Sequence, residues 1–123
     1  MAAPNLLSPT TINGKTVTVN LTSTSATSVL SNAASSGKVL KVNALYVANT
    51  TASNATITIN QYSAAALGGT AFPIASAVVV PANATLVVID KDAYVYLEEN
   101  TSLGATAGTA NALQIVCSYE DIS

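Results

Sequence analysis

The sequence predicts an all-β protein: a single antiparallel β-sandwich of jelly-roll or immunoglobulin-like type with seven to eight strands. Three observations support this fold class. Apolar and polar residues alternate with a period of two along most of the chain. Turn-forming residues recur at short intervals, and no segment has a convincing helical period. A length of 123 residues suits about one domain.

The first half of the chain contains amphipathic strands. Residues 15–22, KTVTVNLT, alternate Val and Leu with hydroxyl-bearing side chains and predict a half-buried strand. Residues 25–31, SATSVLS, form a shorter strand candidate, and SSGK at residues 35–38 predicts a turn. Residues 38–49, KVLKVNALYVAN, predict a strand with one apolar face and a second face that becomes apolar toward its end.

The middle of the chain combines a clear strand with an ambiguous segment. Residues 49–54, NTTASN, have the composition of a hairpin loop, and residues 55–62, ATITINQY, alternate as a strand. Residues 63–73, SAAALGGTAFP, predict a long loop or a crossing between sheets. One helical turn is the alternative, and Gly68 and Pro73 would end it quickly.

Five further strand segments are expected before the C-terminus. Residues 74–80, IASAVVV, and 84–89, ATLVVI, are almost continuously apolar, which is typical of strands that are covered on both faces. Residues 93–99, AYVYLEE, predict a strand, and residues 100–111 predict a short strand interrupted by glycine. Residues 112–120, ALQIVCSYE, predict the final strand.

The N-terminal segment differs from the rest of the chain. Residues 1–12 have no periodicity, contain two prolines, and lack the basic region and apolar run of a signal peptide. We therefore expect an extended arm at residues 1–12 and the β-sandwich domain at residues 13–123. Exposed apolar residues on an arm indicate docking on a neighbouring subunit, through Asn5, Leu6 and Leu7. A frayed terminus is the alternative.

The composition excludes several classes of function. Charged residues make up only 8% of the chain, the net charge is −2, and there is no Arg or His. Without a basic patch we expect no nucleic-acid partner, and without a long apolar span we expect no membrane partner. Cys117 lies on the apolar face of a strand, so we interpret it as a core residue; a reactive thiol is the alternative. We expect no catalytic residues, no metal and no cofactors.

Half of the charged residues gather in one stretch, at residues 90–100. The adjacent Glu98 and Glu99 point to opposite faces of a strand, and Asp92 lies about 20 Å from Glu98 along an extended chain. Carboxylates that cleave glycosides lie about 5 to 9.5 Å apart, so these residues do not form such a pair. A Ca²⁺ site at Asp90 and Asp92 stays an alternative to charges that keep the strand ends in water.

Two tyrosines occupy the outward face of the same strand. If Val95 and Leu97 face the core, then Tyr94 and Tyr96 share the opposite face. Such a pair can stack against a sugar or form a contact between subunits. We favour the subunit contact.

Four segments carry a resemblance to a known family. They are AAPNLLSPTTINGKT, SSGKVLKVNALYVAN, VPANATLVVIDKDAYVYLEENTSLGATA and the final VCSYEDIS. They resemble small virion structural proteins of tailed bacteriophages, notably phages of marine cyanobacteria. The family has Gly where this chain has Asn100. Because Asn tolerates the left-handed conformation, we expect the turn to be kept.

The resemblance implies a structural part of a phage particle, located in the virion and assembled in the host cytoplasm. A head decoration or cement protein fits best, with the major capsid protein or other virion proteins as partners and with a homo-oligomer, a trimer being favoured. A collar, tail or fibre-base component is one alternative, and a carbohydrate-binding adhesin module is another. We expect no enzymatic activity.

Overall fold

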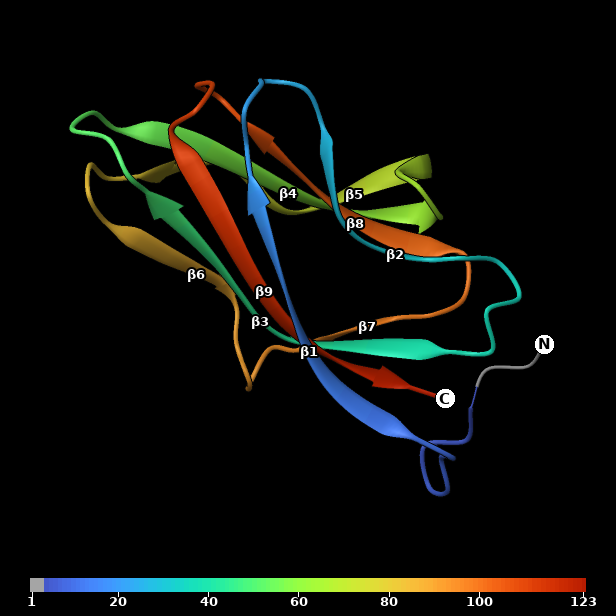
Figure 1. Ribbon diagram of the computed structural model, residues 1–123. Coiled ribbons are helices and arrows are strands. Elements are labelled where there is room, and N and C mark those ends of the chain that lie inside the picture. Colours follow the sequence, from blue (N-terminus) through green and yellow to red (C-terminus); the bar gives the residue numbers. More distant parts are fainter. Residues whose placement is uncertain (1–3) are drawn as a thin grey trace.

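The computed structural model describes residues 4–123, which form a β-sandwich of two antiparallel sheets (Figure 1). Residues 1–3 of the expected N-terminal arm lie outside the described residues. The prediction of an all-β sandwich is confirmed, although the described residues form nine strands. These are β1 (Ile12–Asn20), β2 (Thr27–Asn32), β3 (Val39–Asn49), β4 (Ala55–Ala64), β5 (Gly68–Val80), β6 (Thr85–Ile89), β7 (Val95–Leu97), β8 (Thr101–Ala107) and β9 (Leu113–Ile122).

The strand order is that of a jelly roll. The first sheet, sheet A, has the order β1-β9-β3-β6, with β7 paired to β3 beside β6. The second, sheet B, has the order β2-β8-β4-β5. Most connections therefore cross between the sheets, including residues 49–54, which join β3 to β4. The prediction of a hairpin at residues 49–54 is wrong, because turn-type residues indicate that the chain bends but not which sheet it enters next.

Alternating side chains of both sheets fill the core. Sheet A contributes Leu45 and Val47 from β3, and sheet B contributes Ile57 and Ile59 from β4; all four are fully buried. The other fully buried large side chains are Leu21, Val42, Val80, Ile89, Leu97, Leu103, Leu113 and Ile115. This arrangement follows from the period of two in the sequence.

The segment predicted as a loop at residues 63–73 is largely strand. β4 continues to Ala64, a turn follows, and β5 begins at Gly68 and passes through Pro73. Proline is tolerated there because β5 is the edge of sheet B, so its outer side needs no N–H donor. The register between β4 and β5 also shifts at three points, which accommodates the irregular sequence.

The two apolar runs form edge strands rather than strands covered on both faces. β5 is the edge of sheet B, and β6 is an edge of sheet A. Val79 on β5 is 52% exposed, and Val87 on β6 is 50% exposed. The expectation that both faces are covered is therefore wrong for the single chain.

Two buried asparagines hold the crossings between sheets. Asn32, at the end of β2, donates from Nδ2 to the carbonyl oxygens of Lys38 and Leu97 at 2.9 and 3.0 Å. Asn49, at the end of β3, donates from Nδ2 to the carbonyl oxygens of Ser53 and Val80 at 2.8 and 3.0 Å. Each amide thus ties a crossing loop to the end of a third strand.

Candidate functional site

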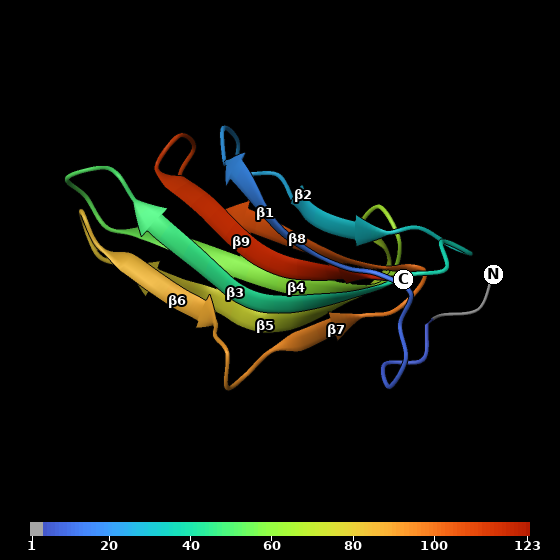
Figure 2. The ribbon, with the colours of Figure 1, turned by 60° about the horizontal axis from the view of Figure 1, so that its bottom comes forward.

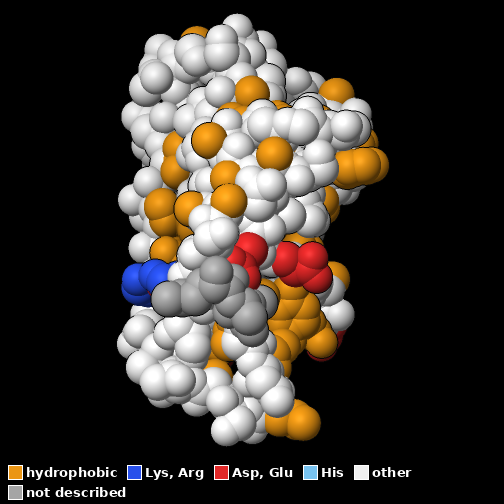
Figure 3. Space-filling model, turned by 90° about the vertical axis from the view of Figure 1, so that its right-hand side faces the viewer, with side chains coloured by type: hydrophobic (Ala, Val, Ile, Leu, Met, Phe, Trp, Pro, Cys, Tyr) orange, Lys and Arg blue, Asp and Glu red, His pale blue; other side chains and the backbone are white. Residues whose placement is uncertain are grey.

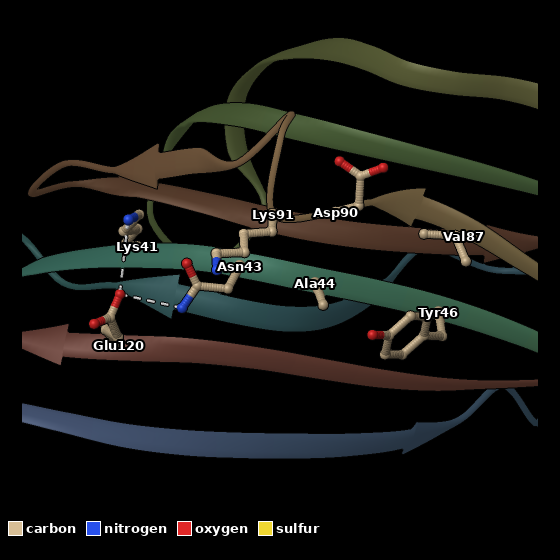
Figure 4. A pocket seen from close by; sticks show the side chains of 8 residues that line it. All are labelled: Lys41, Asn43, Ala44, Tyr46, Val87, Asp90, Lys91 and Glu120. Atoms are coloured by element: carbon tan, nitrogen blue, oxygen red, sulfur yellow. Dashed lines mark hydrogen bonds and ion pairs between the residues drawn. The ribbon is translucent and has the colours of Figure 1, made fainter.

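A groove lies on the outer face of sheet A, where β3 changes partner. β3 pairs with β7 up to Val42 and with β6 from Leu45, so Asn43 and Ala44 lie between the two partners. A register shift against β9 falls at the same point. The chain between β6 and β7 passes outside this gap, which leaves a hollow of about 870 Å³ (Figure 4).

Aromatic and apolar groups form one end of this groove. Tyr46 lies opposite Val87 in the register, and its side chain is 40% exposed. Figure 4 shows that Ala44 lies between the tyrosine ring and the polar end. The short side chain of Ala44 leaves the backbone of β3 accessible from the outer face.

Charged and amide groups form the other end. Glu120 on β9 accepts a 3.1 Å hydrogen bond at Oε2 from Asn43 Nδ2, and Lys41 Nζ lies 3.9 Å from the same oxygen. Lys41 Nζ also lies 4.5 Å from the ring centroid of Tyr94. Lys91 reaches over β3 toward Asn43 (Figure 4). Among residues 4–123, no carboxylate lies within ion-pair distance of the Lys91 ammonium.

The acidic stretch does not gather its carboxylates into one site. Asp90 Oδ1 accepts hydrogen bonds from the backbone N–H groups of Asp92 and Ala93, both at 3.0 Å, so it caps its own loop. Glu99 Oε2 accepts from the backbone of Gly37, at 3.3 Å. In the part of the chain that the structure describes, no three metal-ligating side chains cluster. Seen from one end of the sandwich, charged side chains cover little of the surface (Figure 3).

The predicted tyrosine pair lies on the outer face of sheet A. Val95 packs against the core and Leu97 is fully buried, whereas Tyr94 and Tyr96 are exposed, as their alternation indicates. Their ring centroids lie 5.4 Å apart with the ring planes at 84° to each other. The tyrosines do not line the groove beside them, although Tyr94 contacts Lys41, which does.

The described part of the arm is exposed. Asn5 forms a tight turn, in which its Oδ1 accepts from the Leu7 N–H at 2.9 Å and its carbonyl accepts from the Ser8 N–H at 3.0 Å. This turn presents Leu7, which is 94% exposed, and Leu6 is about half exposed. The arm ends where Thr11 and Ser123 exchange two backbone hydrogen bonds of 2.9 Å.

The two lateral sides of the sandwich differ in character. β1 and β2 lie along one side, and β5 and β6 lie along the other (Figure 2). The β5/β6 side exposes Phe72, Ile74, Val78 and Val79 from β5, together with Val87. No residue between Val42 and Ile89 is charged. Edge strands are commonly protected by charged residues; the β5/β6 side has none.

The sequence did not identify Tyr46, Lys91, Phe72 or Val79 as functional residues. The sequence does show that residues 42–89 contain no charged residue, and β5 and β6 both lie within this range. The groove depends on where β3 changes partner, and a strand order cannot be obtained from alternation alone.

The single cysteine is a core residue, as predicted. Cys117 on β9 is fully buried, and burial raises the pKa of its thiol to about 12. Asp121, four residues later, is almost buried and lies 2.9 Å from Lys15 Nζ and 3.3 Å from Lys38 Nζ. Burial acts to raise the pKa of Asp121, but hydrogen bonds and the charges of both lysines outweigh it and lower the pKa below its ordinary value.

Among residues 4–123, no helix is long and apolar enough to cross a membrane. Comparison with protein-family models finds no match, and comparison with curated proteins finds none either. The chain is similar to a solved structure described as Bacillus endospore appendages that form a novel family of disulfide-linked pili. The two share 18% sequence identity, and the match has a TM-score of 0.52 and covers 92% of this chain and 88% of the other.

This similarity corrects the predicted identity. The interpretation as a cyanophage head-decoration protein, located in the virion and bound to the major capsid protein, is wrong: the match that spans nearly the whole chain is to a pilus structure, and no comparison supports a capsid partner. The segments that carried the resemblance are strand and turn sequences. Such sequences encode a β-sandwich, and a sandwich does not determine what it assembles with.

That solved structure is described as forming pili, and the absence of enzymatic activity in this chain stays a prediction. The expected turn at Asn100 is present, with φ of 59°.

Proposed function

We propose that the protein is the structural subunit of a filament, which it forms by self-association between the β5/β6 side of one copy and the β1/β2 side of the next. The uncharged, apolar β5/β6 side carries this proposal. Exposed apolar surface that is rimmed by polar residues is typical of contacts between proteins. The similarity to a pilus structure supports the same class of function.

The two lateral sides are suited to contact each other rather than themselves. They lie at opposite edges of both sheets (Figure 2). A contact between two different surfaces of the same subunit is heterologous, and if its rotation does not close, it produces an open filament. The β1/β2 side has the free edge of β1, whose exposed Thr16, Thr18 and Asn20 are uncharged.

Side-chain burial rather than long backbone pairing would stabilise this contact. Pro73 and the register shifts interrupt the outer edge of β5, which leaves short regular stretches such as Val78–Val80. Phe72 is 58% exposed, so it can bury a large apolar area against a second copy. Two further contacts belong to the same proposal: the arm through Asn5, Leu6 and Leu7, and the outward pair Tyr94 and Tyr96.

Covalent links between subunits do not transfer from the similar pilus to this chain. That pilus is described as disulfide-linked, whereas Cys117 is the single cysteine of this chain and is fully buried. We therefore propose that this filament is held without disulfides. We also propose that it is an extracellular appendage and that the subunit has no enzymatic activity.

Substitution of the β5/β6 side tests the proposal. The purified full chain is expected to form polymers that sediment and appear as filaments by negative-stain electron microscopy. The double variant Phe72→Lys, Val79→Lys places two charges on this side and should stay monomeric at concentrations at which the wild type polymerises. Both side chains are more than half exposed, so unfolding free energy should change by less than about 0.5 kcal/mol per site.

Val116→Lys is the matched control, because Val116 is also an exposed valine but lies on β9, an inner strand of sheet A. It should polymerise as the wild type does. A wild-type chain that stays monomeric up to millimolar concentration in sedimentation velocity runs would refute the filament function. Normal polymerisation of the double variant would refute the assigned contact.

A further inference from the structure

We propose that the groove on the outer face of sheet A binds a saccharide that carries a carboxylate, with the sugar ring against Tyr46 and its carboxylate on Lys91. The groove shares Val87 with the β5/β6 side, and the experiments below separate saccharide binding from filament formation. Small-molecule sites are concave, and they combine apolar surface with a few polar groups that converge. The hollow of about 870 Å³ has both features.

The apolar end of the groove fits the face of a sugar ring. Pyranose rings present C–H groups on one face, and these pack against the negative face of an aromatic ring. Tyr46 is part of the sheet and pairs with Val87 on one side and Val116 on the other, so its position is fixed by three strands. Ala44 beside it has no bulk that would hold a ring away from the sheet.

The polar end fits the hydroxyl groups of a sugar. Glu120 uses Oε2 for the hydrogen bond from Asn43 and for the contact with Lys41, which leaves Oε1 for a hydroxyl donor. The amide of Asn43 can accept at Oδ1 while its Nδ2 donates to Glu120. The Asn43 amide is therefore oriented before any ligand arrives.

The charge balance selects a sugar with one carboxylate. The groove contains two ammonium groups, Lys41 and Lys91, and two carboxylates, Asp90 and Glu120. Lys41 is opposed by Glu120, and Asp90 caps its own loop with its carboxylate directed away from Tyr46 (Figure 4). Lys91 is left to form a charge-assisted hydrogen bond with a ligand. A phosphate dianion would bring two negative charges against this single unopposed ammonium group.

The charge assignment can be tested with a matched pair of probes, trigalacturonate and its methyl ester. They are titrated into the ¹⁵N-labelled full chain that carries Phe72→Lys and Val79→Lys, which is expected to stay monomeric and leaves the groove lining unchanged, and binding is followed by NMR. We expect the acid to shift the amide signals of Asn43, Ala44, Tyr46 and Lys91 with a Kd below about 1 mM, and the ester to bind about tenfold more weakly. No shifts at about 10 mM acid would overturn the site. Equal binding of the ester would overturn the role of Lys91.

Variants test the two ends of the groove separately. Lys91→Ala and Tyr46→Ala should each weaken binding about tenfold, whereas Lys91→Arg should stay within about twofold. Tyr96→Ala is the matched control for Tyr46→Ala, because Tyr96 has similar exposure on the same face but does not line the groove. Unchanged affinity in both test variants would overturn the assignment.

A binding measurement on polymerised protein distinguishes a ligand site in the groove from a contact between subunits on the same face. Bound trigalacturonate can be measured by co-sedimentation with polymerised protein, and the proposal expects the same affinity as for the monomer. Loss of binding on polymerisation would show that a second copy covers the groove, which would overturn the saccharide assignment and leave the filament function intact. If the protein binds trigalacturonate but does not polymerise, the filament function is refuted and the saccharide site is kept.

Discussion

At the residue scale, burial determines the chemistry of Cys117. The thiol is fully buried, and its pKa of about 12 keeps it protonated at neutral pH. Thiolate is the form that reacts with alkylating agents and disulfides. The side chain therefore acts as a small apolar group of the core, and its local environment opposes oxidative linkage.

We expect Cys117 to be alkylated by iodoacetamide at pH 8 at least about 100-fold more slowly in the native protein than in urea, because reaction requires unfolding. Mass spectrometry of timed samples measures both rates. The proposed filaments should also persist in about 10 mM dithiothreitol, since the proposed contact contains no disulfide. Filament loss in the reductant, or labelling of the native protein at the rate seen in urea, would contradict this.

The lowered pKa of Asp121 predicts how the stability of the fold changes as the pH falls. Its pKa is lowered in the folded protein, so the unfolded chain binds the proton more tightly. This contribution to stability is fully present above the unfolded pKa of about 3.9 and is lost as the pH falls through the lower, folded pKa. Chemical denaturation at pH values from 2.5 to 7 (about half-unit steps) measures it. Asp121→Asn should lower stability by about 1–3 kcal/mol at pH 7 and flatten the acid limb.

At alkaline pH, the free energy of unfolding changes in the opposite direction: it falls as the pH rises. The pKa of Lys15 is raised by its hydrogen bond to Asp121, and burial raises the pKa of Cys117. Both groups hold their protons more tightly in the folded state, so stability should fall as the pH rises above about 9. Cys117→Ala should reduce this slope in denaturation curves between pH 8 and 11. An unchanged slope in that variant would contradict the role of the thiol.

At the element scale, the buried amide of Asn49 joins the end of β3 to the end of β5. Asn49→Ala removes the buried hydrogen bond to the Val80 carbonyl and the bond to the Ser53 carbonyl. It also removes the amide oxygen that accepts from the N–H and hydroxyl of Thr51. We expect a loss of about 2–4 kcal/mol, since each buried group left unpaired costs about 1–3 kcal/mol. Thermal unfolding measured by circular dichroism provides the value. Asn20→Ala, at an exposed position of β1, is the control and should change stability by less than about 0.5 kcal/mol.

The elements that could be predicted from sequence are those in which alternation and burial coincide. β1, β3, β4 and β9 have one face in the core, so their period of two is clear. β5 was missed in its first half because Gly68 and Pro73 disfavour a strand, and Pro73 is tolerated there because β5 lies at an edge of sheet B. An edge position is a property of the assembled sheet and is not encoded locally.

The candidate groove could not be predicted for the same reason. Tyr46, Lys91 and Glu120 are far apart in the sequence and meet only because β9 and the chain between β6 and β7 flank β3. The outward direction of Tyr94 and Tyr96 was predictable, because it depends on the alternation around Leu97 alone. Whether the tyrosines contact another subunit stays a prediction.

At the scale of the whole molecule, the distribution of charge predicts how filaments respond to salt. The side proposed for the contact belongs to a stretch of the chain without charges, so screening has little to act on. Filament yield should change by less than about twofold between 0.05 and 1 M NaCl, and sulfate should increase it, because sulfate strengthens apolar burial. Pelleting assays measure both. A tenfold loss in 1 M NaCl would indicate a contact made by charges.

The backbone hydrogen bonds between Thr11 and Ser123 bring two distant points of the sequence side by side. A short linker between them would close the polypeptide into a ring without moving a strand. New ends could then be opened in the exposed residues 52–54 between β3 and β4, at the far end of the sandwich (Figure 1). The jelly roll is therefore suited to circular permutation, and a fused cargo could be placed at either pole of each subunit along the proposed filament.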